Sequence, residues 1–463
     1  MTKALLIRPT PNQLVEASTK KFHRRFPPLS LLYIASMLRN ENWHVTLFDI
    51  HADPKTHQEE VISKAKKFDL IIVTTNPYAD WQCPSYEIDP IIEFCKELPS
   101  EKLVLIGNHG THFPGSLLNQ TGAKIIVRGE PEIIVSSIAK SLKENNFNLN
   151  QIEGISFRDT STIIHNNMPK PSNEFNFPTP AYDLVDLKNY QYELLGKNFA
   201  ILETTRGCPF SCSFCNLSMF VKRYRKRPVS HVLSEIDDLV ENHGCRSLYI
   251  FDLEFAVNTK MAEAVCRHLI EKEYVKKYDF KWTCQTRADS ISESLLKLMK
   301  ISGCELIHFG VESGNSDILS ATNKRIDKNN ITKGILETQK AGINIAAFFM
   351  IGFPGENKKT YQETLDFALK LNPTYASFHP LLPIPGSPIY TEKYGASPYW
   401  DEEMPKNMTY FDENQAAEID AFIKKAYKAY YIRPKYIWQT LSHGKLKHYK
   451  MQLKLFKNFA FNR

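Results

Sequence analysis

The chain has 463 residues and a net charge of +7; 43 % of the residues are hydrophobic and 24 % are charged. These values are typical of a globular protein of several domains and not of a disordered one. No apolar run approaches the about 20 residues that cross a bilayer. The first apolar stretch ends at Arg8 and Pro9, which is typical of a strand and not of a signal peptide. We therefore expect a cytoplasmic protein.

Short apolar runs alternate with helical stretches over residues 1–145. Strands are predicted at residues 4–7, 45–48, 70–74, 103–106 and 125–127, and helices at 29–39, 57–67, 86–97, 114–119 and 130–142. This alternation predicts an α/β domain with a Rossmann-like, doubly wound parallel sheet covered on both faces. Ligands of such sheets bind beyond the carboxyl ends of the strands. No G-x-G-x-x-G follows the first strand, so the usual dinucleotide signature is absent.

A connector is predicted over residues 146–195, where asparagines and prolines interrupt regular structure and residues 152–157 and 162–165 are predicted to pair as a hairpin. The alternation then resumes. Strands are predicted at 200–204, 248–251, 281–285, 306–311, 345–350 and 375–381, and helices at 230–242, 260–275, 292–301, 328–341 and 358–371. We expect a partial (βα)6 TIM-type barrel over residues 196–395 and a basic helical region over 396–463. Chemistry in such barrels lies in the loops after the strands.

Three of the nine cysteines, Cys208, Cys212 and Cys215, fall directly after the first predicted barrel strand in the pattern C-x3-C-x2-C. An odd number of cysteines without an export signal argues against a disulfide framework, whereas thiolates bind soft metals and iron–sulfur clusters. A structural zinc site needs four ligands, so one alternative is zinc completed by His231 or His243, and another is three unrelated buried cysteines. Three ligands for a four-iron cluster leave one iron open to a substrate or cofactor.

The segment around these cysteines resembles the hallmark of the radical S-adenosylmethionine (SAM) enzymes, in which an aromatic residue precedes the third cysteine. Phe214 fills that position, and the resemblance extends from residue 200 to about 390. It implies a [4Fe–4S] cluster bound by Cys208, Cys212 and Cys215, with SAM on the open iron. In that family one electron from the cluster cleaves SAM to a radical that abstracts hydrogen from the substrate. An electron donor such as flavodoxin or ferredoxin is therefore expected.

The resemblance implies SAM contacts at the ends of the second and third barrel strands. Asp252 and Glu254 resemble the acidic stretch that meets the SAM ammonium group through a charge-assisted hydrogen bond. The alternative for these carboxylates is a cap for the following helix. Gln285 and Arg287 resemble a SAM-contacting segment, with a salt bridge between Arg287 and Glu254 as the alternative.

Further SAM contacts are implied after the fourth and fifth barrel strands. Glu312 and Ser313 lie in an element similar to the one whose carboxylate accepts hydrogen bonds from the SAM ribose; the alternative for Glu312 is a structural salt bridge. Gly352 and Pro354 lie in a segment that resembles the adenine-contacting loop, and an ordinary tight turn is its alternative.

The N-terminal region resembles the branch of this superfamily that carries a cobalamin-binding domain before the barrel. This branch includes anaerobic magnesium-protoporphyrin monomethyl ester cyclase and many C- and P-methylases. Residues 27–35, 127–132 and 429–436 are similar to it, as are residues 106–111, which resemble a G-G-x-H-x-[ST] loop with Asn108 where a glycine is usual. The resemblance thus implies a cobalamin-binding-like domain over residues 1–145.

Cobalamin contacts are expected at the carboxyl ends of the first-domain strands. Many members of this branch bind cobalamin without a histidine ligand, and the residues in the matching positions are Thr75, Asn76, Gly107, His109, Thr111 and Gly129. Asp49-Ile50-His51 resembles part of the D-x-H-x-x-G motif of histidine-ligated cobalamin proteins, but it follows the second strand and lacks the glycine, so we interpret it as a coincidence. The alternative is a cobalamin-free remnant domain.

The basic residues are concentrated at the end of the chain, where residues 421–463 contain eleven Lys or Arg and no Asp or Glu. Tyrosines and Trp438 are interleaved with them. One interpretation is a solvated basic helix face; the other is an interfacial helix that docks on an anionic surface such as a membrane, an acidic partner or RNA.

Taken together, the sequence predicts a radical SAM enzyme that functionalises an unactivated carbon of a small or lipid-like molecule, by methyl transfer, ring formation or rearrangement. An RNA-modifying enzyme such as a tRNA methylthiotransferase is the main alternative. That group uses three more cysteines before the barrel, where only Cys83 and Cys95 are present, so nucleic acid is not expected as a partner. The third alternative is a non-enzymatic sensor or electron relay, against which the cysteine triplet and Glu312 argue.

Overall fold

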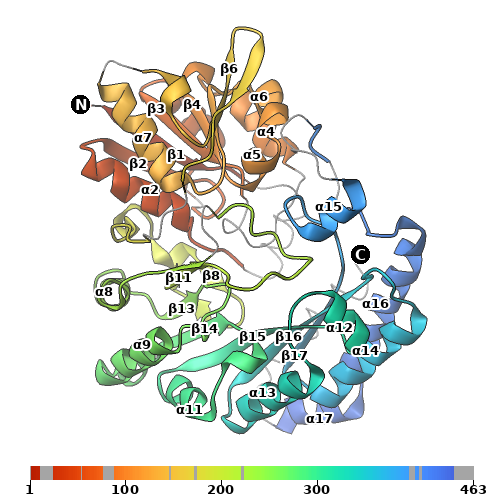
Figure 1. The fold of residues 1–463 in the computed structure, drawn as a ribbon. Coiled ribbons are helices and arrows are strands. Elements are labelled where there is room, and N and C mark those ends of the chain that lie inside the picture. Colours follow the sequence, from red (N-terminus) through yellow and green to blue (C-terminus); the bar gives the residue numbers. More distant parts are fainter. Residues whose placement is uncertain are drawn as a thin grey trace.

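The computed structural model describes residues 2–10, 24–53, 55–76, 88–144, 147–170, 175–220, 224–395, 402–405 and 409–442. Within these residues, a seven-stranded sheet and a six-stranded sheet form the two main layers of strands. Figure 1 shows the first sheet, in red to yellow, above the second sheet, in green to blue. Cys83 and the basic residues after 442 lie outside the described residues.

The first sheet has the strand order β2-β1-β3-β4-β5-β6-β7. Its parallel part consists of β1 (Lys3–Arg8), β2 (His44–Asp49), β3 (Leu70–Thr74), β4 (Leu103–Ile106) and β5 (Ile125–Val127). This confirms the predicted doubly wound sheet. The hairpin of β6 (Ile155–Asp159) and β7 (Thr162–His165), expected within the connector, pairs antiparallel with β5 and extends the first sheet.

Helices cover both faces of the first sheet because its central strands are apolar on both sides. α2 (Leu29–Asn40) and α7 (Pro131–Lys143) pack on one face, and α3 (Gln58–Ala65), α4 (Asp89–Lys96) and α6 (Pro114–Thr121) pack on the other. A short helix, α5 (Asn108–His112), stands where a loop was expected after β4. Gly107, with φ of +118°, makes the sharp turn from β4 into this helix.

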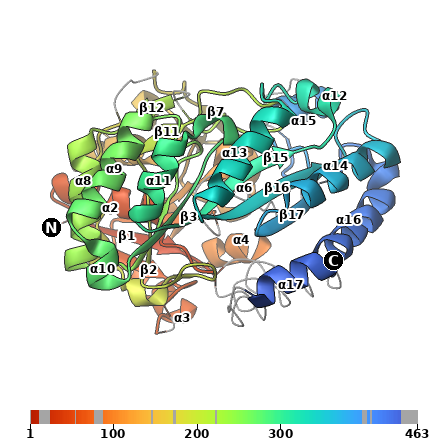
Figure 2. The same ribbon diagram turned by 90° about the horizontal axis from the view of Figure 1, so that it is seen from below.

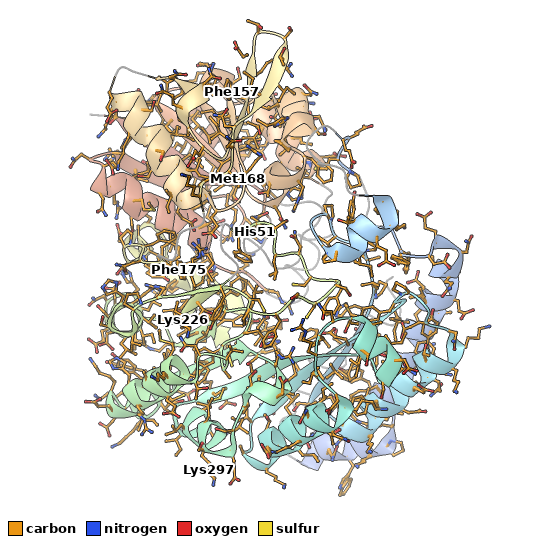
Figure 3. The ribbon with its side chains drawn as sticks, viewed as in Figure 1. His51, Phe157, Met168, Phe175, Lys226 and Lys297 are labelled. Atoms are coloured by element: carbon orange, nitrogen blue, oxygen red, sulfur yellow. The ribbon has the colours of Figure 1, made fainter. Side chains whose placement is uncertain are left out.

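The connector packs between the two sheets. It contains single-turn 3-10 helices at Tyr182–Leu184 and Leu187–Asn189 and the short pair β8 (Gln191–Tyr192) and β9 (Gly196–Lys197). Its Phe175 belongs to the same buried apolar cluster as the strands of the second sheet. Figure 3 labels Phe175 in the region between the two sheets.

The second sheet is fully parallel, in the order β10-β13-β14-β15-β16-β17. Its strands are β10 (Phe199–Leu202), β13 (Ser247–Ile250), β14 (Lys281–Gln285), β15 (Cys304–Glu312), β16 (Asn344–Ile351) and β17 (Tyr375–Pro380). The helices between them are α8 (Val229–Asp237), α9 (Thr259–Glu271), α10 (Tyr274–Tyr278), α11 (Glu293–Ile301), α12 (Ser316–Ala321), α13 (Lys328–Lys340) and α14 (Lys358–Leu371). The predicted strand–helix alternation of a partial barrel is confirmed.

The C-terminal helices α15 (Pro388–Tyr394), α16 (Ala416–Tyr431) and α17 (Pro434–Ser442) follow the second sheet. α16 packs on β17 and α14, as Figure 2 shows from below. The tyrosines expected on an interfacial helix face the sheet: Tyr427, Tyr430 and Tyr436 are buried in its core cluster, whereas Trp438 is 74 % exposed. Among the described residues, none of the helices combines the length and the apolar character needed to cross a membrane.

Candidate active site

The three clustered cysteines lie in one loop whose ends are joined by a short ribbon. β11 (Thr205–Gly207) pairs antiparallel with β12 (Tyr224–Lys226), and Cys208 follows β11 directly. We call this pair the β11–β12 ribbon and residues 208–223 the cysteine loop. Both ends of the loop therefore lie at this ribbon, just after the first strand of the second sheet.

The thiols of the cysteine loop are neighbours in a partly buried environment. Cys208 is buried, Cys212 and Cys215 are half-buried, and none of the three forms a disulfide. Burial and, to a smaller extent, the nearby thiols of Cys212 and Cys208 raise the pKa of Cys215 to about 12, and burial also raises the pKa of Cys212. Because metal ligation requires the thiolate, binding of iron to this loop must be coupled to the release of protons.

The residues present fit an iron–sulfur cluster better than a single metal ion. Within the described ranges, no three or more His, Cys, Asp or Glu side chains form a group that could hold one ion, so His231 and His243 do not complete a zinc site with the cysteines. The His243 ring is paired with Asp238 instead, at 3.3 Å. In a [4Fe–4S] cluster each thiolate binds a different iron, so the three sulfur atoms need not converge on one point.

Backbone hydrogen bonds tie the cysteine loop to the rim of the second sheet. The Ser213 N–H donates to the Thr322 carbonyl at 2.9 Å, and the Ser213 carbonyl accepts from Ile389 N–H at 2.9 Å. The Asn323 side-chain amide donates to the Ser211 carbonyl at 2.9 Å. The turn after α12 and the start of α15 thus hold the loop in place between Cys212 and Cys215.

Asp252, expected to meet the SAM ammonium group, has both carboxylate oxygens engaged within the protein. They accept hydrogen bonds from the backbone N–H groups of Thr204 and Thr205, at 2.6 and 3.1 Å, and from both hydroxyls. The carboxyl is fully buried, and burial raises its pKa. Asp252 therefore organises the residues between β10 and β11, directly before the cysteine loop.

Glu254 and Arg287 lie together, but not as the salt bridge that was one alternative. The Glu254 carboxylate accepts a hydrogen bond from the backbone N–H of Arg287 at 2.7 Å, whereas the Arg287 guanidinium pairs with Asp289 at 2.7 Å and lies 4.0 Å from the centre of the Phe210 ring. Gln285 donates to the Leu253 carbonyl at 3.2 Å. Burial raises the pKa of Glu254 to about 7, so this carboxyl titrates near neutrality.

Glu312 is paired with a lysine that the sequence analysis did not identify. Lys324 Nζ donates to Glu312 Oε1 at 2.6 Å and to the Gly310 carbonyl at 2.7 Å, and both charged side chains are buried. A Cβ atom at position 310 would meet the ends of these two side chains and would have to displace them. Lys324 also lies close enough to lower the pKa of Cys212 and Glu254 by its charge. It is therefore a buried cation of this rim, as is Arg287.

The other predicted SAM contacts shape the neighbouring loops. Ser313 Oγ hydrogen-bonds the Thr364 hydroxyl at 3.2 Å. Gly352 N–H donates to Glu356 Oε2 at 2.6 Å in a tight turn, and Pro354 follows two residues later. Phe214, between the second and third cysteines, packs edge-on against Phe353 of this turn, with 5.7 Å between ring centres. The structure thus brings the cysteine loop and the predicted adenine loop into contact.

The predicted cobalamin contacts lie together at the carboxyl edge of the first sheet. His109 Nδ1 lies 3.0 Å from Thr75 Oγ1, Thr111 Oγ1 donates to the Gly107 carbonyl at 3.0 Å, and Gly129 N–H donates to Thr111 Oγ1 at 2.9 Å. These residues are buried or have polar groups that are already hydrogen-bonded. Asn76 Oδ1 accepts from the backbone N–H of Asn108 at 3.1 Å.

Asn108, which replaces a usual glycine, supplies an unsatisfied acceptor at this edge. Its Oδ1 is buried and has no hydrogen-bond partner within the described part of the chain. A buried carbonyl oxygen without a donor is costly, and a ligand with amide N–H groups around its edge would satisfy it. A corrin carries such amides, so the residues present fit this cofactor.

Asp49 and His51 take part in structural contacts. The Asp49 carboxylate pairs with Arg8 at 2.5 Å and accepts from the Tyr190 hydroxyl at 2.7 Å. Burial lowers the pKa of His51 to about 3, so the ring stays neutral. Asp49 therefore links Arg8 of the first sheet to Tyr190 of the connector.

The edge of the first sheet lies against the cysteine loop. His112 Nε2, at the end of α5, is 3.0 Å from the side-chain amide of Asn216. A Cβ atom at Gly129 would lie 3.3 Å from the Met219 carbonyl. The residues predicted to bind cobalamin and those predicted to bind the cluster therefore belong to one continuous site.

Residues 202–368 match the model of the Radical SAM superfamily. An uncharacterised methyltransferase of Pyrococcus horikoshii is 29 % identical over 90 % of this chain and 91 % of its own length. The anaerobic magnesium-protoporphyrin IX monomethyl ester cyclase of Cereibacter sphaeroides is 28 % identical over 79 % of this chain. The match covers 60 % of that cyclase, so this chain corresponds to only part of the longer relative.

Two solved structures have a similar fold. The radical SAM methyltransferase TsrM of Kitasatospora setae, solved with cobalamin and a [4Fe–4S] cluster, matches 92 % of this chain and 91 % of its own with a TM-score of 0.73 and 16 % identity. The cobalamin-dependent SAM radical enzyme OxsB, solved with aqua-cobalamin and SAM, matches 98 % of this chain and 72 % of its own, with a TM-score of 0.73 and 17 % identity.

Proposed function

This chain carries a radical SAM domain and is a radical SAM enzyme related to cobalamin-dependent methylases and cyclases; from this premise we propose that it functionalises an unactivated carbon with cobalamin as its second cofactor. Methyl transfer is the first reaction to test, and ring formation is the second. The observation that carries the proposal is the contact between the cysteine loop and the polar edge of the first sheet. In this proposal residues 1–145 hold cobalamin and residues 196–395 hold the cluster and SAM.

Cys208, Cys212 and Cys215 would bind three irons, and SAM would occupy the fourth. When bound, the cluster and SAM supply a one-electron cleavage that can remove hydrogen from an unactivated carbon. Packing of Phe214 on Phe353 closes the cysteine loop over the adenine turn and helps to exclude water.

The rim of the second sheet offers charges that suit SAM. Glu254 is proposed to accept a hydrogen bond from the SAM ammonium group, in preference to Asp252, whose oxygens are both engaged. Lys324 is proposed to meet the SAM carboxylate, and Glu312 the ribose hydroxyls, because the pair lies beside Cys212 and Glu254. Gly352 and Pro354 are proposed to contact the adenine through the tight turn that Glu356 holds. Gln285, Arg287 and Ser313 are proposed to position these groups.

The edge of the first sheet offers neutral polar groups and close backbone. Thr75, Asn76, Gly107, Thr111 and Gly129 are proposed to contact the corrin through loop backbone and hydroxyls. His109 is buried and its Nδ1 faces Thr75, so we propose a positioning role for it and no ligation of cobalt.

The substrate is proposed to be a small molecule, and the electron donor an acidic redox protein such as flavodoxin or ferredoxin. A methylthiotransferase with a second cluster would need three more cysteines before the barrel, where only Cys83 and Cys95 are present. In the described part of the chain before residue 146 the free cysteine is Cys95, which is buried and whose pKa is raised to about 12 by that burial.

Three measurements on the anaerobically reconstituted full chain test the proposal: iron content, SAM cleavage and corrin retention. About four irons per chain and production of 5′-deoxyadenosine from SAM are expected. After hydroxocobalamin is added, the corrin absorption band should remain with the protein through gel filtration. A protein that cleaves SAM but releases the corrin completely would contradict the cobalamin part of the proposal and leave a remnant first domain.

A further inference from the structure

Two buried arginines face each other across the β11–β12 ribbon, the neck of the cysteine loop. Arg206 and Arg225 are register partners in the ribbon and are 1 % and 4 % exposed. Both reach the carboxylate of Glu130, which comes from the first sheet: Arg206 Nη1 donates to Oε2 at 3.3 Å, and Arg225 Nη2 donates to Oε1. One carboxylate therefore bridges the two strands of the neck.

One aromatic ring packs near both guanidinium groups of this bridge. The centre of the Phe175 ring lies 4.6 Å from the Arg206 guanidinium carbon and 5.7 Å from that of Arg225. Figure 3 shows Phe175 between the first sheet and Lys226 of β12. Charged pairs are stronger and more directional in such a dry environment than at a surface.

Arg206 also pairs with two further carboxylates. Glu132, in the first turn of α7, lies 2.8 Å from Arg206 Nη2, and Glu203, just before the ribbon, lies 2.8 Å from the same nitrogen. Glu130 differs from these two neighbours because, among the described residues, it is the carboxylate that pairs with both arginines.

Glu130 is connected to the carboxyl edge of the first sheet by a short chain of contacts. The Thr111 hydroxyl donates to the Gly107 carbonyl and accepts from Gly129 N–H, at 3.0 and 2.9 Å. Gly129 precedes Glu130 directly and has φ of +76°, which turns the chain from β5 into α7. At the other end Arg206 lies two residues before Cys208. A continuous path of contacts therefore runs from Gly107 to the first cysteine.

We propose that Glu130 is a positioning residue that couples the two cofactor edges, so that filling the cysteine loop with its cluster tightens cobalamin binding at the first sheet. The inference rests on the proposed function, because it takes cobalamin as the ligand of that edge. Coupling of this kind is reciprocal between two binding sites. Glu130 acts by holding the neck of the cysteine loop against the loop that contains Gly129.

Glu130→Gln is the sharpest test because it keeps the volume and removes the second acceptor. A glutamine side chain can accept from one arginine, but its NH2 group faces the other guanidinium and cannot bond it. Glu132→Gln is the matched control, since it removes a charge from the same buried group, at 0 % exposure, without breaking the bridge across the ribbon.

Hydroxocobalamin is titrated by absorbance into the full chain, once iron-free and once after anaerobic reconstitution. For the unmodified chain and for Glu132→Gln, we expect at least about fivefold tighter binding in the reconstituted state, the lower end of typical coupling between sites. For Glu130→Gln, the two affinities should agree within about twofold. Equal coupling in Glu130→Gln and the unmodified chain, or equal loss in both variants, would overturn the proposal.

A second measurement tests the Glu130 bridge even when cobalamin does not bind. Hydrogen exchange of the amides in residues 205–207 and 224–226 is compared in the iron-free variants. Faster exchange in Glu130→Gln than in Glu132→Gln supports the bridge, and equal exchange overturns it, whereas absent corrin binding contradicts only the proposed function. If circular dichroism shows that Glu130→Gln does not fold, Arg225→Gln removes the other half of the bridge, and the same outcomes apply.

Discussion

The rim of the second sheet and the carboxyl edge of the first sheet are both proposed to hold a cofactor beyond the ends of parallel strands. The side chains that they offer to the cofactor differ in charge. The rim is charged: Glu254, Glu312 and Lys324 lie within reach of one another beside Cys212. The predicted cobalamin contacts at the edge of the first sheet include polar groups without formal charge: Thr75 and the amide of Asn76 are buried there, beside the amide of Asn108. Charges at the rim suit a zwitterionic sulfonium compound, and neutral groups suit a large flat ligand with an amide border.

Because of this difference, we expect ligand binding at the two regions to respond to different substitutions. Removing a charge at the rim should weaken binding through electrostatics and change its pH dependence. At the edge of the first sheet, where the polar groups other than Asn108 Oδ1 are mostly satisfied internally, a change of shape should matter more than a change of charge. The following predictions test this contrast, from the largest effect to the smallest.

Loss of a cluster ligand should have the largest effect. Cys212→Ala is expected to reduce 5′-deoxyadenosine formation to background, because an iron then lacks its thiolate. Hydroxocobalamin should still be retained, although less tightly. Iron content and product are measured together, with Cys245→Ala, a buried thiol outside the cysteine loop, as the control. Persistent SAM cleavage in Cys212→Ala would contradict the assignment of the cluster site.

Removal of the buried cation should come next. Lys324→Met is expected to weaken SAM binding about 10- to 100-fold, because a hydrogen bond to a charged group contributes about 1.5–3 kcal/mol. The control is Lys333→Met, an exposed lysine on α13. Equilibrium binding of SAM to the reconstituted chain is the measurement. An affinity equal to that of Lys333→Met would remove Lys324 from the SAM site and weaken the contrast between the regions.

A shape change at the first sheet should act on cobalamin alone. Gly107→Ala places a Cβ atom 2.8 Å from Thr75 Oγ1 at a φ of +118°, and should lower hydroxocobalamin affinity at least about tenfold while iron content stays unchanged. Gly244→Ala meets nothing within 4 Å at a φ of +67°, and separates the backbone strain from the steric effect. Equal corrin binding by the two variants would show that Gly107 does not shape the corrin site.

The effect of pH on SAM affinity should be smaller than the effects of these substitutions, and it should arise at the rim of the second sheet. Because burial raises the pKa of Glu254 to about 7, its carboxyl is mostly protonated below that pH and cannot pair with an ammonium group. SAM affinity is therefore expected to increase up to about tenfold from about pH 6 to pH 8. In Glu254→Gln the dependence should be flat. Hydroxocobalamin binding should change little over the same range, and an equally steep profile for both ligands would break the contrast.

Residues 443–463 should affect neither region. Because α16 packs on β17, removal of residues 421–463 would damage the fold, whereas removal of 443–463 spares the described helices. We expect the shorter deletion to leave SAM and corrin binding unchanged and to reduce sedimentation with anionic liposomes at least a few-fold, because each basic residue near the surface contributes about 1 kcal/mol. Unchanged sedimentation would favour a solvated basic face.

The sequence analysis predicted the strands and the cysteine loop, because apolar alternation and cysteine spacing are local signals. Glu312 came from the family resemblance, and its pairing with Lys324 is the structural salt bridge that was the alternative for it. Sequence patterns did not predict α5, since Asn108–His112 has no apolar period and becomes helical only where Gly107 turns the chain out of β4. Lys324 was missed for a similar reason. It is presented by a turn with positive φ at both Asn323 and Arg325, and its partner lies on β15. Such pairs arise from tertiary packing, which spacing along the chain does not report.

The last strand of the second sheet has an edge that no further strand covers among the described residues. Three tyrosine hydroxyls from the C-terminal helices meet the backbone groups of that edge: Tyr427 at Phe378, Tyr431 at Ala376 and Tyr436 at Thr374. Unpaired strand edges recruit strands from other molecules and begin aggregation. These phenol groups cap the exposed strand edge. Replacing the three tyrosines with phenylalanine would leave its backbone groups unpaired and prone to aggregation, without changing any predicted cofactor contact.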